Sequence, residues 1–334
     1  MKKSLLAFAV LAAVSGAASA QSSVTLYGKV DLGLVADSGA AAGKSIRVSS
    51  GVTGGSRVGF KGTEDLGGGL KAAFQIETGY CADGTSTASF CTGGGFMGRQ
   101  AHGDLIGSFG SISAGRQYSL GFNNLDTIDP FDTGLAGQID NIIDPSGVRL
   151  NNSFTYTTPT FAGFNVSGEI ALGEQTGNWA ANRETGGAVT YAKGPAYAGF
   201  TFYSLDNASG TGAARKNYTL GGTYDFGVVK VHALGQKSTG NSALDVLDFM
   251  GGVTVPAAGG SILASYIHHN DRTFANKDAS QIGVGYLYPL SKRTTIYTAF
   301  AKIQNQHGAT FTVGNATEDG TGNKAFNLGI SHNF

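Results

Sequence analysis

The residues with the clearest chemical potential lie between Gln117 and Gly147, in a stretch that carries acidic side chains and no basic ones. Its carboxylates are Asp126, Asp129, Asp132, Asp140 and Asp144. Arginines flank the stretch, with Arg99 and Arg116 before it and Arg149 after it. Carboxylates that face guanidinium groups create an electric field across a narrow space. Such a field sorts ions by sign without any bond chemistry.

The length and composition of this stretch indicate that it is folded. A connection of roughly thirty residues between short strands is usually functional or disordered. Its many large apolar side chains argue against a disordered linker; they are Leu125, Ile128, Phe131, Leu135, Ile139, Ile142 and Ile143. We therefore expect the stretch to fold into the lumen of a β-barrel and to place its acids across from a basic wall. The alternative is an outside loop packed on itself.

Alternating residues indicate the strands that would position these groups. Between Val24 and Leu34, apolar side chains alternate with polar ones such as Tyr27, Lys29 and Asp31. A period of two places the two sets on opposite faces of a strand. The pattern recurs after every turn and predicts sixteen strands. Short turns alternate with long connections, which include 37–55, 79–98 and 305–324. This is typical of a transmembrane, antiparallel outer-membrane β-barrel.

The end of the chain supports a barrel over its main alternative, a soluble β-sandwich or lectin. Phe326, Leu328, Ile330 and Phe334 share one face of the last predicted strand. A lipid-facing strand that ends in an aromatic residue suits the interface girdle of a membrane barrel. The high, even strand number and the Gly-, Ala- and aromatic-rich apolar faces also favour the barrel. A closed barrel pairs every backbone group within the lipid.

Composition excludes several other classes of protein. A chain of 334 residues fits a single barrel. Its 53 glycines are spread without the triplet period that collagen requires. The 23 basic residues balance the 23 acidic ones, which argues against a nucleic-acid partner.

The N-terminus is typical of an export signal. Lys2 and Lys3 precede the apolar run 5–14, and an A-x-A cleavage site follows at 18–20. We expect residues 1–20 to be a signal peptide and residues 21–334 to form one barrel domain. In an exported protein, Cys81 and Cys91 predict one local disulfide, whereas a metal site would need more ligands nearby.

Several segments resemble the trimeric general porins of the Gram-negative outer membrane, most closely the beta-proteobacterial type. These segments are QSSVTLYGKVDLGL, GSRVGFKGTEDLGGGLKAAFQIE, GRQYSL, RLNNSFTYTTPTFAGF and NLGISHNF. The resemblance extends from Gln21 to Phe334, and SRVGFKGTEDLGGG is its most specific piece. It implies a homotrimer in outer-membrane lipids, a third long loop folded inward, and passive diffusion of small hydrophilic solutes and ions. It implies no cofactor.

The resemblance also implies a constriction in which wall bases face acids on the inward loop. The corresponding wall positions are Lys29, Arg57, Arg99 and Arg149, and the loop positions are Asp126, Asp129 and Asp132. The basic residues slightly outnumber the acidic ones, so we expect a weak to moderate preference for anions. Arg116 shares parity with Ile112 and Ala114, which places it outside the pore.

Three other functions are alternatives to a general pore. A barrel hydrolase would need a converging nucleophile and base, but His268 and His269 are adjacent in a strand and point to opposite faces. A substrate-specific outer-membrane channel and a non-conducting structural or adhesive barrel remain open alternatives. No calcium-binding motif in the sequence supports a calcium site at the loop acids.

Overall fold

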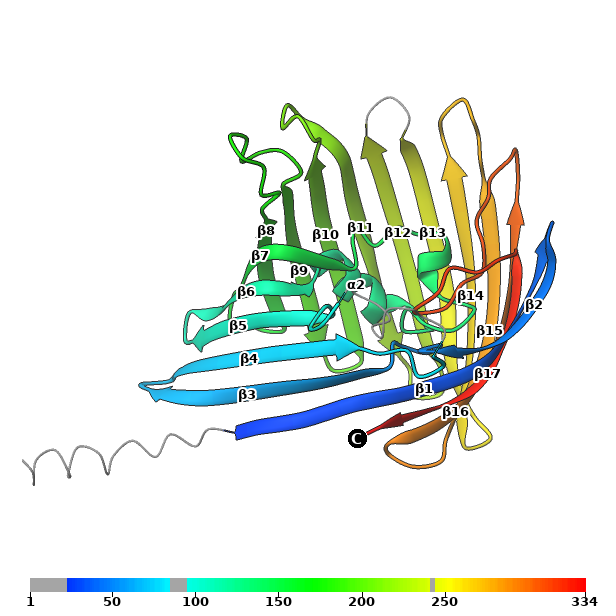
Figure 1. Ribbon diagram of the computed structural model, residues 1–334, viewed down its shortest axis with the longest axis horizontal. Coiled ribbons are helices and arrows are strands. Elements are labelled where there is room, and N and C mark those ends of the chain that lie inside the picture. Colours follow the sequence, from blue (N-terminus) through cyan, green and yellow to red (C-terminus); the bar gives the residue numbers. More distant parts are fainter. Residues whose placement is uncertain (1–22, 85–94, 241–243) are drawn as a thin grey trace, which may run out of the picture.

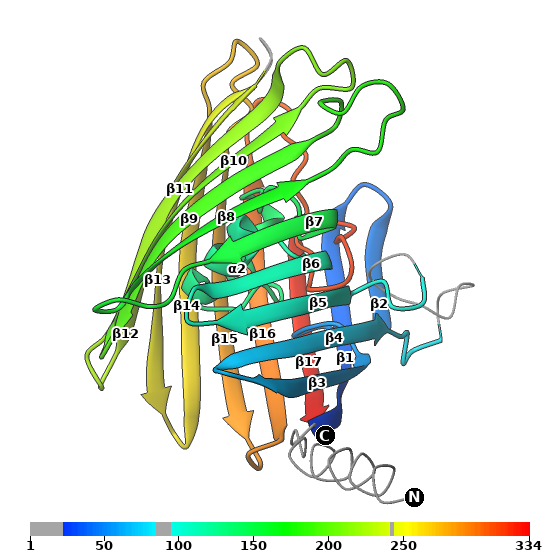
Figure 2. The same ribbon diagram turned by 90° about the vertical axis from the view of Figure 1, so that its left-hand side faces the viewer.

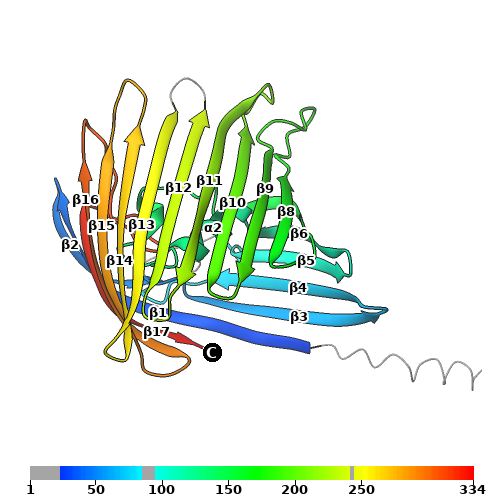
Figure 3. The same cartoon turned by 180° about the vertical axis from the view of Figure 1, so that it is seen from behind.

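A computed structural model describes residues 23–84, 95–240 and 244–334. All described strands belong to one antiparallel sheet, which closes where β1 pairs with β17 (Figures 1 and 3). The strands are β1 (Ser23–Ala40), β2 (Gly43–Ser50), β3 (Arg57–Gly67), β4 (Leu70–Gly79), β5 (Gln100–Gly107), β6 (Gly110–Tyr118), β7 (Arg149–Thr157), β8 (Phe164–Ala171), β9 (Glu184–Lys193), β10 (Ala196–Asp206), β11 (Ala213–Asp225), β12 (Lys230–Gly240), β13 (Asp245–Ala257), β14 (Gly260–Asp271), β15 (Ala279–Pro289), β16 (Thr294–Asn305) and β17 (Lys324–Asn333).

Strands β2 and β3 together occupy one strand position in the barrel. The C-terminal half of β1 pairs with β2, beginning at Leu32 opposite Ser50. The N-terminal half of β1 pairs with β3, up to Lys29 opposite Arg57. The barrel therefore has sixteen strand positions, which confirms the predicted fold. The prediction of one long loop over residues 37–55 is wrong, because most of these residues form the β1–β2 hairpin and only 51–56 leave the sheet.

The two faces of the wall differ as the alternation predicts. On β17, Phe326, Leu328 and Ile330 are exposed on the outer face, while Ala325 and Asn327 are buried inside. The terminal residue Phe334 exchanges backbone hydrogen bonds with Gly28 across the β1–β17 seam. A side chain at position 28 would overlap the Phe334 ring, so the ring covers this part of the closure.

The ends of the barrel also differ from each other (Figures 1 and 2). Tight turns lie at one end; at the β3–β4 turn, Gly67, Gly68 and Gly69 all have positive φ, a conformation that glycine adopts without strain. Longer connections lie at the other end. Among the described residues, no helix is long and apolar enough to cross a membrane.

The segment between β6 and β7 lies inside the ring of strands, as all three views agree (Figures 1, 2 and 3). It contains helix α2 (Leu120–Ile128) and the short helix η1 (Ile139–Asn141). Its apolar side chains are buried together with inner-wall residues of the later strands, which include Leu234, Met250, Leu263, Ile267, Ala301 and Ile303. The lumen is therefore apolar where the segment covers it, although the inner face of a porin-like barrel is usually polar.

Two sequence predictions fall on residues that the structure does not describe. The predicted signal peptide, residues 1–20, precedes the described chain. Cys91, the predicted partner of Cys81, also lies outside the described residues. Both remain predictions.

Inner-wall glycines make room for the 119–148 segment, and this yields a prediction. A Cβ added at Gly252 would lie 2.5 Å from Pro130 Cγ and 3.0 Å from the Ala264 carbonyl oxygen. Its neighbour Gly251 has no described atom within 4 Å of the corresponding position. Overpacking costs about 1–3 kcal/mol, so Gly252→Val should speed hydrogen exchange of the 120–143 amides by roughly tenfold. Gly251→Val should leave it unchanged; equal exchange rates in the two variants would contradict the packing argument.

Candidate functional site

A cavity of about 560 Å³ lies between the inner wall and the inward segment. Four basic residues line it: Lys29, Arg57, Arg99 and Arg149. Three acidic residues also line it: Asp126, Asp132 and Asp140. The fold thus brings all four predicted wall bases together with two of the three predicted loop acids. These groups come from β1, β3, β7, the residue before β5, and the 119–148 segment.

The arginines on the wall are held by fixed partners. Arg99 is 3% exposed, and its Nε donates to Glu77 Oε1 at 2.7 Å. Arg57 Nη1 lies 3.9 Å from the same carboxylate oxygen. Arg99 and Arg149 both donate from Nη2 to the Tyr118 hydroxyl, at 2.6 and 2.7 Å. The sequence alone does not indicate this role of Glu77, whose buried charge offsets part of the basic cluster.

Tyr118 connects the basic cluster to the start of helix α2. The Arg149 guanidinium lies 4.4 Å from the centre of the Tyr118 ring, which stacks on Phe122 at 4.9 Å. Ser119 caps the helix by accepting from Phe122 N at 3.0 Å. Glu169 on β8 accepts from Leu120 N at 3.1 Å. A carboxylate at a helix N-terminus is favourable, so the wall itself fixes where the inward segment begins.

The bend at 51–56, between β2 and β3, supplies a second support for the bases. Lys29 Nζ donates to Thr53 Oγ1 at 3.0 Å, and Arg57 Nε donates to the Gly55 carbonyl oxygen at 2.8 Å. Thr53, Gly54 and Gly55 line the cavity beside these two bases. The sequence predicts an outer loop here and therefore does not indicate this inward bend.

The acidic side is built on a turn with unusual backbone geometry. Asp132 and Thr133 have positive φ values of 49° and 47°, and such residues concentrate at functional sites. Asp126 Oδ1 accepts from the Thr133 hydroxyl at 2.5 Å. Burial and the neighbouring Asp126 charge raise the pKa of Asp132 to about 6. Burial, with the charges of Asp129 and Asp126, raises the pKa of Asp140 well above its ordinary value.

The prediction that Asp129 lines the pore needs correction. Asp129 is 1% exposed and is not among the described residues that line the cavity. Its carboxylate accepts from the backbone N–H groups of Phe131, Thr133 and Ile139, at 3.1, 3.1 and 2.9 Å. It therefore stabilises the turn after helix α2. This role depends on a backbone fold that the residue type alone cannot reveal.

Two further charged residues lie away from the cavity lining. Asp144 pairs with Arg215 on β11, which ties the segment to the wall. Arg116 donates to the Gly98 carbonyl oxygen in a partly buried contact and to Asn151 Oδ1 in an exposed one. Arg116 is not among the described residues that line the cavity, and its position outside the pore stays a prediction.

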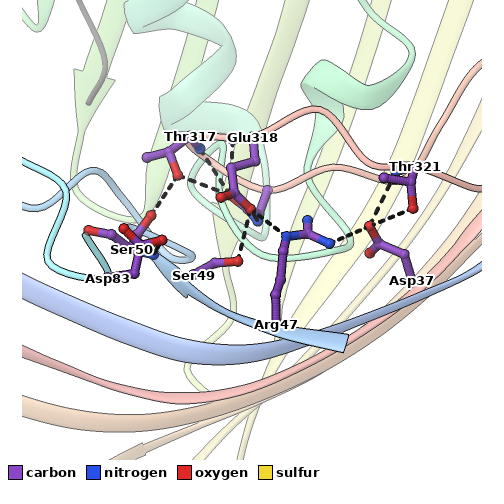
Figure 4. Close-up of polar contacts among 9 residues, drawn as sticks. Asp37, Arg47, Ser49, Ser50, Asp83, Thr317, Glu318 and Thr321 are labelled. Atoms are coloured by element: carbon purple, nitrogen blue, oxygen red, sulfur yellow. Dashed lines mark hydrogen bonds and ion pairs between the residues drawn. The ribbon is translucent and has the colours of Figure 1, made fainter. Parts of the chain in front are cut away.

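A second segment, residues 306–323 between β16 and β17, also folds toward the lumen (Figure 4). Arg47 on β2 holds it directly by donating to Glu318 Oε2 at 3.0 Å. Arg47 also donates at 2.7 Å to Asp37 Oδ2 on β1, which accepts from Thr321 N of the segment at 3.2 Å. The Thr317 hydroxyl donates to the Ser50 carbonyl oxygen at 2.6 Å. This segment was predicted only as a long outer connection.

The second segment also contacts the first one. Gln138 Nε2 donates to the Asn315 carbonyl oxygen at 2.9 Å, and Gly314 N donates to Asn141 Oδ1 at 2.9 Å. The two segments border a smaller cavity of about 330 Å³ that includes Asp140 and Arg149. Residues from both segments thus narrow the same lumen.

Residues 7–309 match the family profile described as Gram-negative porin. The chain belongs to this family. This porin is a passive channel of the Gram-negative outer membrane and not an enzyme. The barrel with an internal segment agrees with that assignment.

Individual relatives of this porin cover nearly all of its length. It is 35% identical to Outer membrane porin protein 32 of Delftia acidovorans, with 100% of both chains covered. It is 30% identical to an outer membrane porin protein of Bordetella pertussis, covering 91% of this chain and 95% of the relative. The solved anion-selective porin from Comamonas acidovorans superposes with a TM-score of 0.80 at 30% identity, covering 94% of this chain and 100% of the other.

The contacts of Arg47 predict that it sets the width of the channel mouth. Arg47→Ala leaves Asp37 and Glu318 without their cationic partner, and breaking a partly buried pair of this kind costs about 1–3 kcal/mol. Segment 306–323 should then move away from β2, and single-channel conductance in planar bilayers should rise. Lys44 is exposed on the same strand, so Lys44→Ala is the matched control. Identical conductance in the two variants would refute the role of Arg47.

Proposed function

We propose that this porin conducts small hydrophilic solutes and inorganic ions with a weak to moderate preference for anions. The proposed constriction consists of Lys29, Arg57, Arg99 and Arg149 on the wall and Asp126 and Asp132 on the inward segment. One observation carries the proposal, namely that these six side chains line a single cavity. The similarity to a porin that is described as anion-selective supports the sign of the preference.

The charge balance within the cavity favours anions. Four bases face three acids. Burial also raises the pKa of Asp132 to about 6, so mild acidification reduces the negative charge of the cavity. At 4 Å, two unit charges interact by about 1 kcal/mol in bulk water and by about 4 kcal/mol at an effective dielectric constant of 20. A hydrated pore lies between these limits. Such energies are sufficient to discriminate ions by sign and too small to trap them.

The bases suit this task because their geometry is fixed. Guanidinium groups stay charged and bind several partners in one plane. Hydrogen bonds to Glu77 and Tyr118 fix the orientation of Arg99, and a bond to Tyr118 fixes that of Arg149. Passing ions therefore meet preorganised charges. No bond is formed or broken during passage.

We also propose that the porin functions as a homotrimer in outer-membrane lipids. The resemblance to trimeric general porins supports the number three. The parity of Arg116 with Ile112 and Ala114 supports a covered outer surface, because a charged side chain on the lipid face of a barrel is unfavourable. A neighbouring subunit over β6 and β7 would remove that penalty.

Ion selectivity tests the constriction directly. In a tenfold KCl gradient, the reversal potential of the unmodified porin should indicate a preference for chloride over potassium. The double variant Arg57→Gln/Arg149→Gln should lower the chloride-to-potassium permeability ratio by roughly threefold or more, because each lost charge removes about 1 kcal/mol of attraction. Arg116→Gln is the control and should change the ratio far less. Cation preference in the unmodified porin would overturn the proposal, and absence of any conductance would favour a closed structural barrel.

The pKa of Asp132 predicts a pH dependence with a definite sign. Because this pKa is raised to about 6, the carboxyl is mostly ionised at pH 7.5 and mostly neutral at pH 5. Acidification removes a negative charge from the cavity, so the preference for chloride should increase between these pH values. Asp132→Asn should abolish most of the change, whereas Glu64→Gln, an exposed substitution on β3, should keep it. A ratio that is independent of pH in the unmodified porin would contradict the assignment of Asp132 to the cavity.

A further inference from the structure

A fully buried carboxylate lies directly behind the basic side of the cavity. Asp31 on β1 is 0% exposed and is not among the described residues that line the cavity. Its Oδ1 accepts from Val52 N at 3.1 Å and from the Tyr297 hydroxyl at 2.7 Å. Its Oδ2 accepts from Thr53 N at 3.1 Å and from the Thr53 hydroxyl. An acceptor-only group suits a site where every neighbour donates.

The sheet topology explains why an acceptor is needed at this position. Pairing of β1 with β3 ends at Lys29 opposite Arg57, and pairing with β2 begins at Leu32 opposite Ser50. The intervening bend, residues 51–56, therefore leaves the ladder, and its N–H groups need other partners. Asp31 lies in this gap and binds two of them.

The same carboxylate reaches the bases through Thr53. The Thr53 hydroxyl donates to Asp31 and accepts from Lys29 Nζ at 3.0 Å. Two residues further along the bend, the Gly55 carbonyl oxygen accepts from Arg57 Nε at 2.8 Å. The orientation of the bend thus determines where two of the four bases point.

The bend also connects the other inward segments. The Val52 carbonyl oxygen accepts from Leu135 N at 2.8 Å, within the 119–148 segment, and from Ala316 N at 3.5 Å, within the 306–323 segment. Tyr297 joins the assembly from β16. Asp31 therefore holds the point at which three inward-folded segments meet.

We infer that Asp31 is a positioning residue for ion selection: it fixes the 51–56 bend so that Lys29 and Arg57 present their charges to the cavity. The inference depends on the proposed anion preference. It makes a prediction opposite in sign to that of simple charge counting. Removal of a nearby negative charge alone would increase the preference for anions, whereas loss of the positioned bases decreases it.

The test uses Asp31→Asn in the full-length porin, with the reversal potential in a KCl gradient as the readout. The amide keeps the size of the side chain but turns one acceptor into a donor, which then faces a backbone N–H of Val52 or Thr53. The chloride-to-potassium ratio should fall by roughly twofold or more. A rise in the ratio would overturn the inference, because Asp31 would then act only through its charge.

Thr53 variants provide a second test that changes no charge. Thr53→Val removes the hydroxyl that links Asp31 to Lys29, and it should lower the ratio in the same direction. Thr53→Ser keeps the hydroxyl and should restore the unmodified value. If Thr53→Val behaves like the unmodified porin, the positioning role is refuted. Far-UV circular dichroism and migration of unheated samples on gels verify the barrel, and the threonine pair decides the question if Asp31→Asn does not fold.

The outcomes separate this inference from the proposed function. If the unmodified porin lacks anion preference, the proposed function fails and the role of Asp31 in ion selection fails with it. If the unmodified porin prefers anions and neither Asp31→Asn nor Thr53→Val lowers the ratio, only the role of Asp31 is refuted.

Discussion

Backbone that folds into the lumen must find hydrogen-bond partners outside the sheet, and the rest of this porin depends on that constraint. Strands within a barrel pair with their neighbours, but inward segments lose this option. Here buried side chains supply the missing partners. Asp31 serves the bend at 51–56, Glu169 the start of helix α2, and Gln281 the carbonyl oxygens of Gly137 and Gln138. Side chains of the wall are therefore placed so that they bond the backbone groups of the inward segments.

The charges of the cavity follow from the same arrangement. The bases come from the wall, where β-strands fix their backbone, while the acids come from a segment that is held by those buried partners. Neither set could face the other if the inward segments moved. Opposed charges of this kind are useful only at fixed separation, because their interaction falls with distance and is screened by water and salt. Ion selection in this fold therefore depends on the rigid support of the inward segments.

The fold could be predicted from alternation because each strand has one wet and one lipid-facing side, and that contrast is written locally in the sequence. The wall bases were implied by the family resemblance, and alternation agreed with it for Lys29, Arg57 and Arg149. Residues 45–49 also alternate, with Ile46 and Val48 exposed between inward Ser45, Arg47 and Ser49, but small flanking residues disguised the strand.

The remaining features depend on contacts between residues far apart in the sequence. Arg47 and Glu318 are separated by 271 positions, so neither residue alone indicates that segment 306–323 turns inward. Asp129 looked like its acidic neighbours, and only the turn at Asp132 and Thr133 directs backbone N–H groups toward it. Local sequence patterns specify which face a residue takes, but not which distant group it meets.

The row of small residues beneath the inward segment has a consequence for assembly. Gly252 and Gly283 receive Pro130 and Phe131, yet both glycines lie more than a hundred positions after the residues that they accommodate. The 119–148 segment therefore lacks part of its packing surface until β13 and β15 have joined the sheet. Until then its buried isoleucines and leucines are exposed, which makes unassembled chains prone to aggregation. The contacts that bury this segment therefore depend on strands that follow it in the chain.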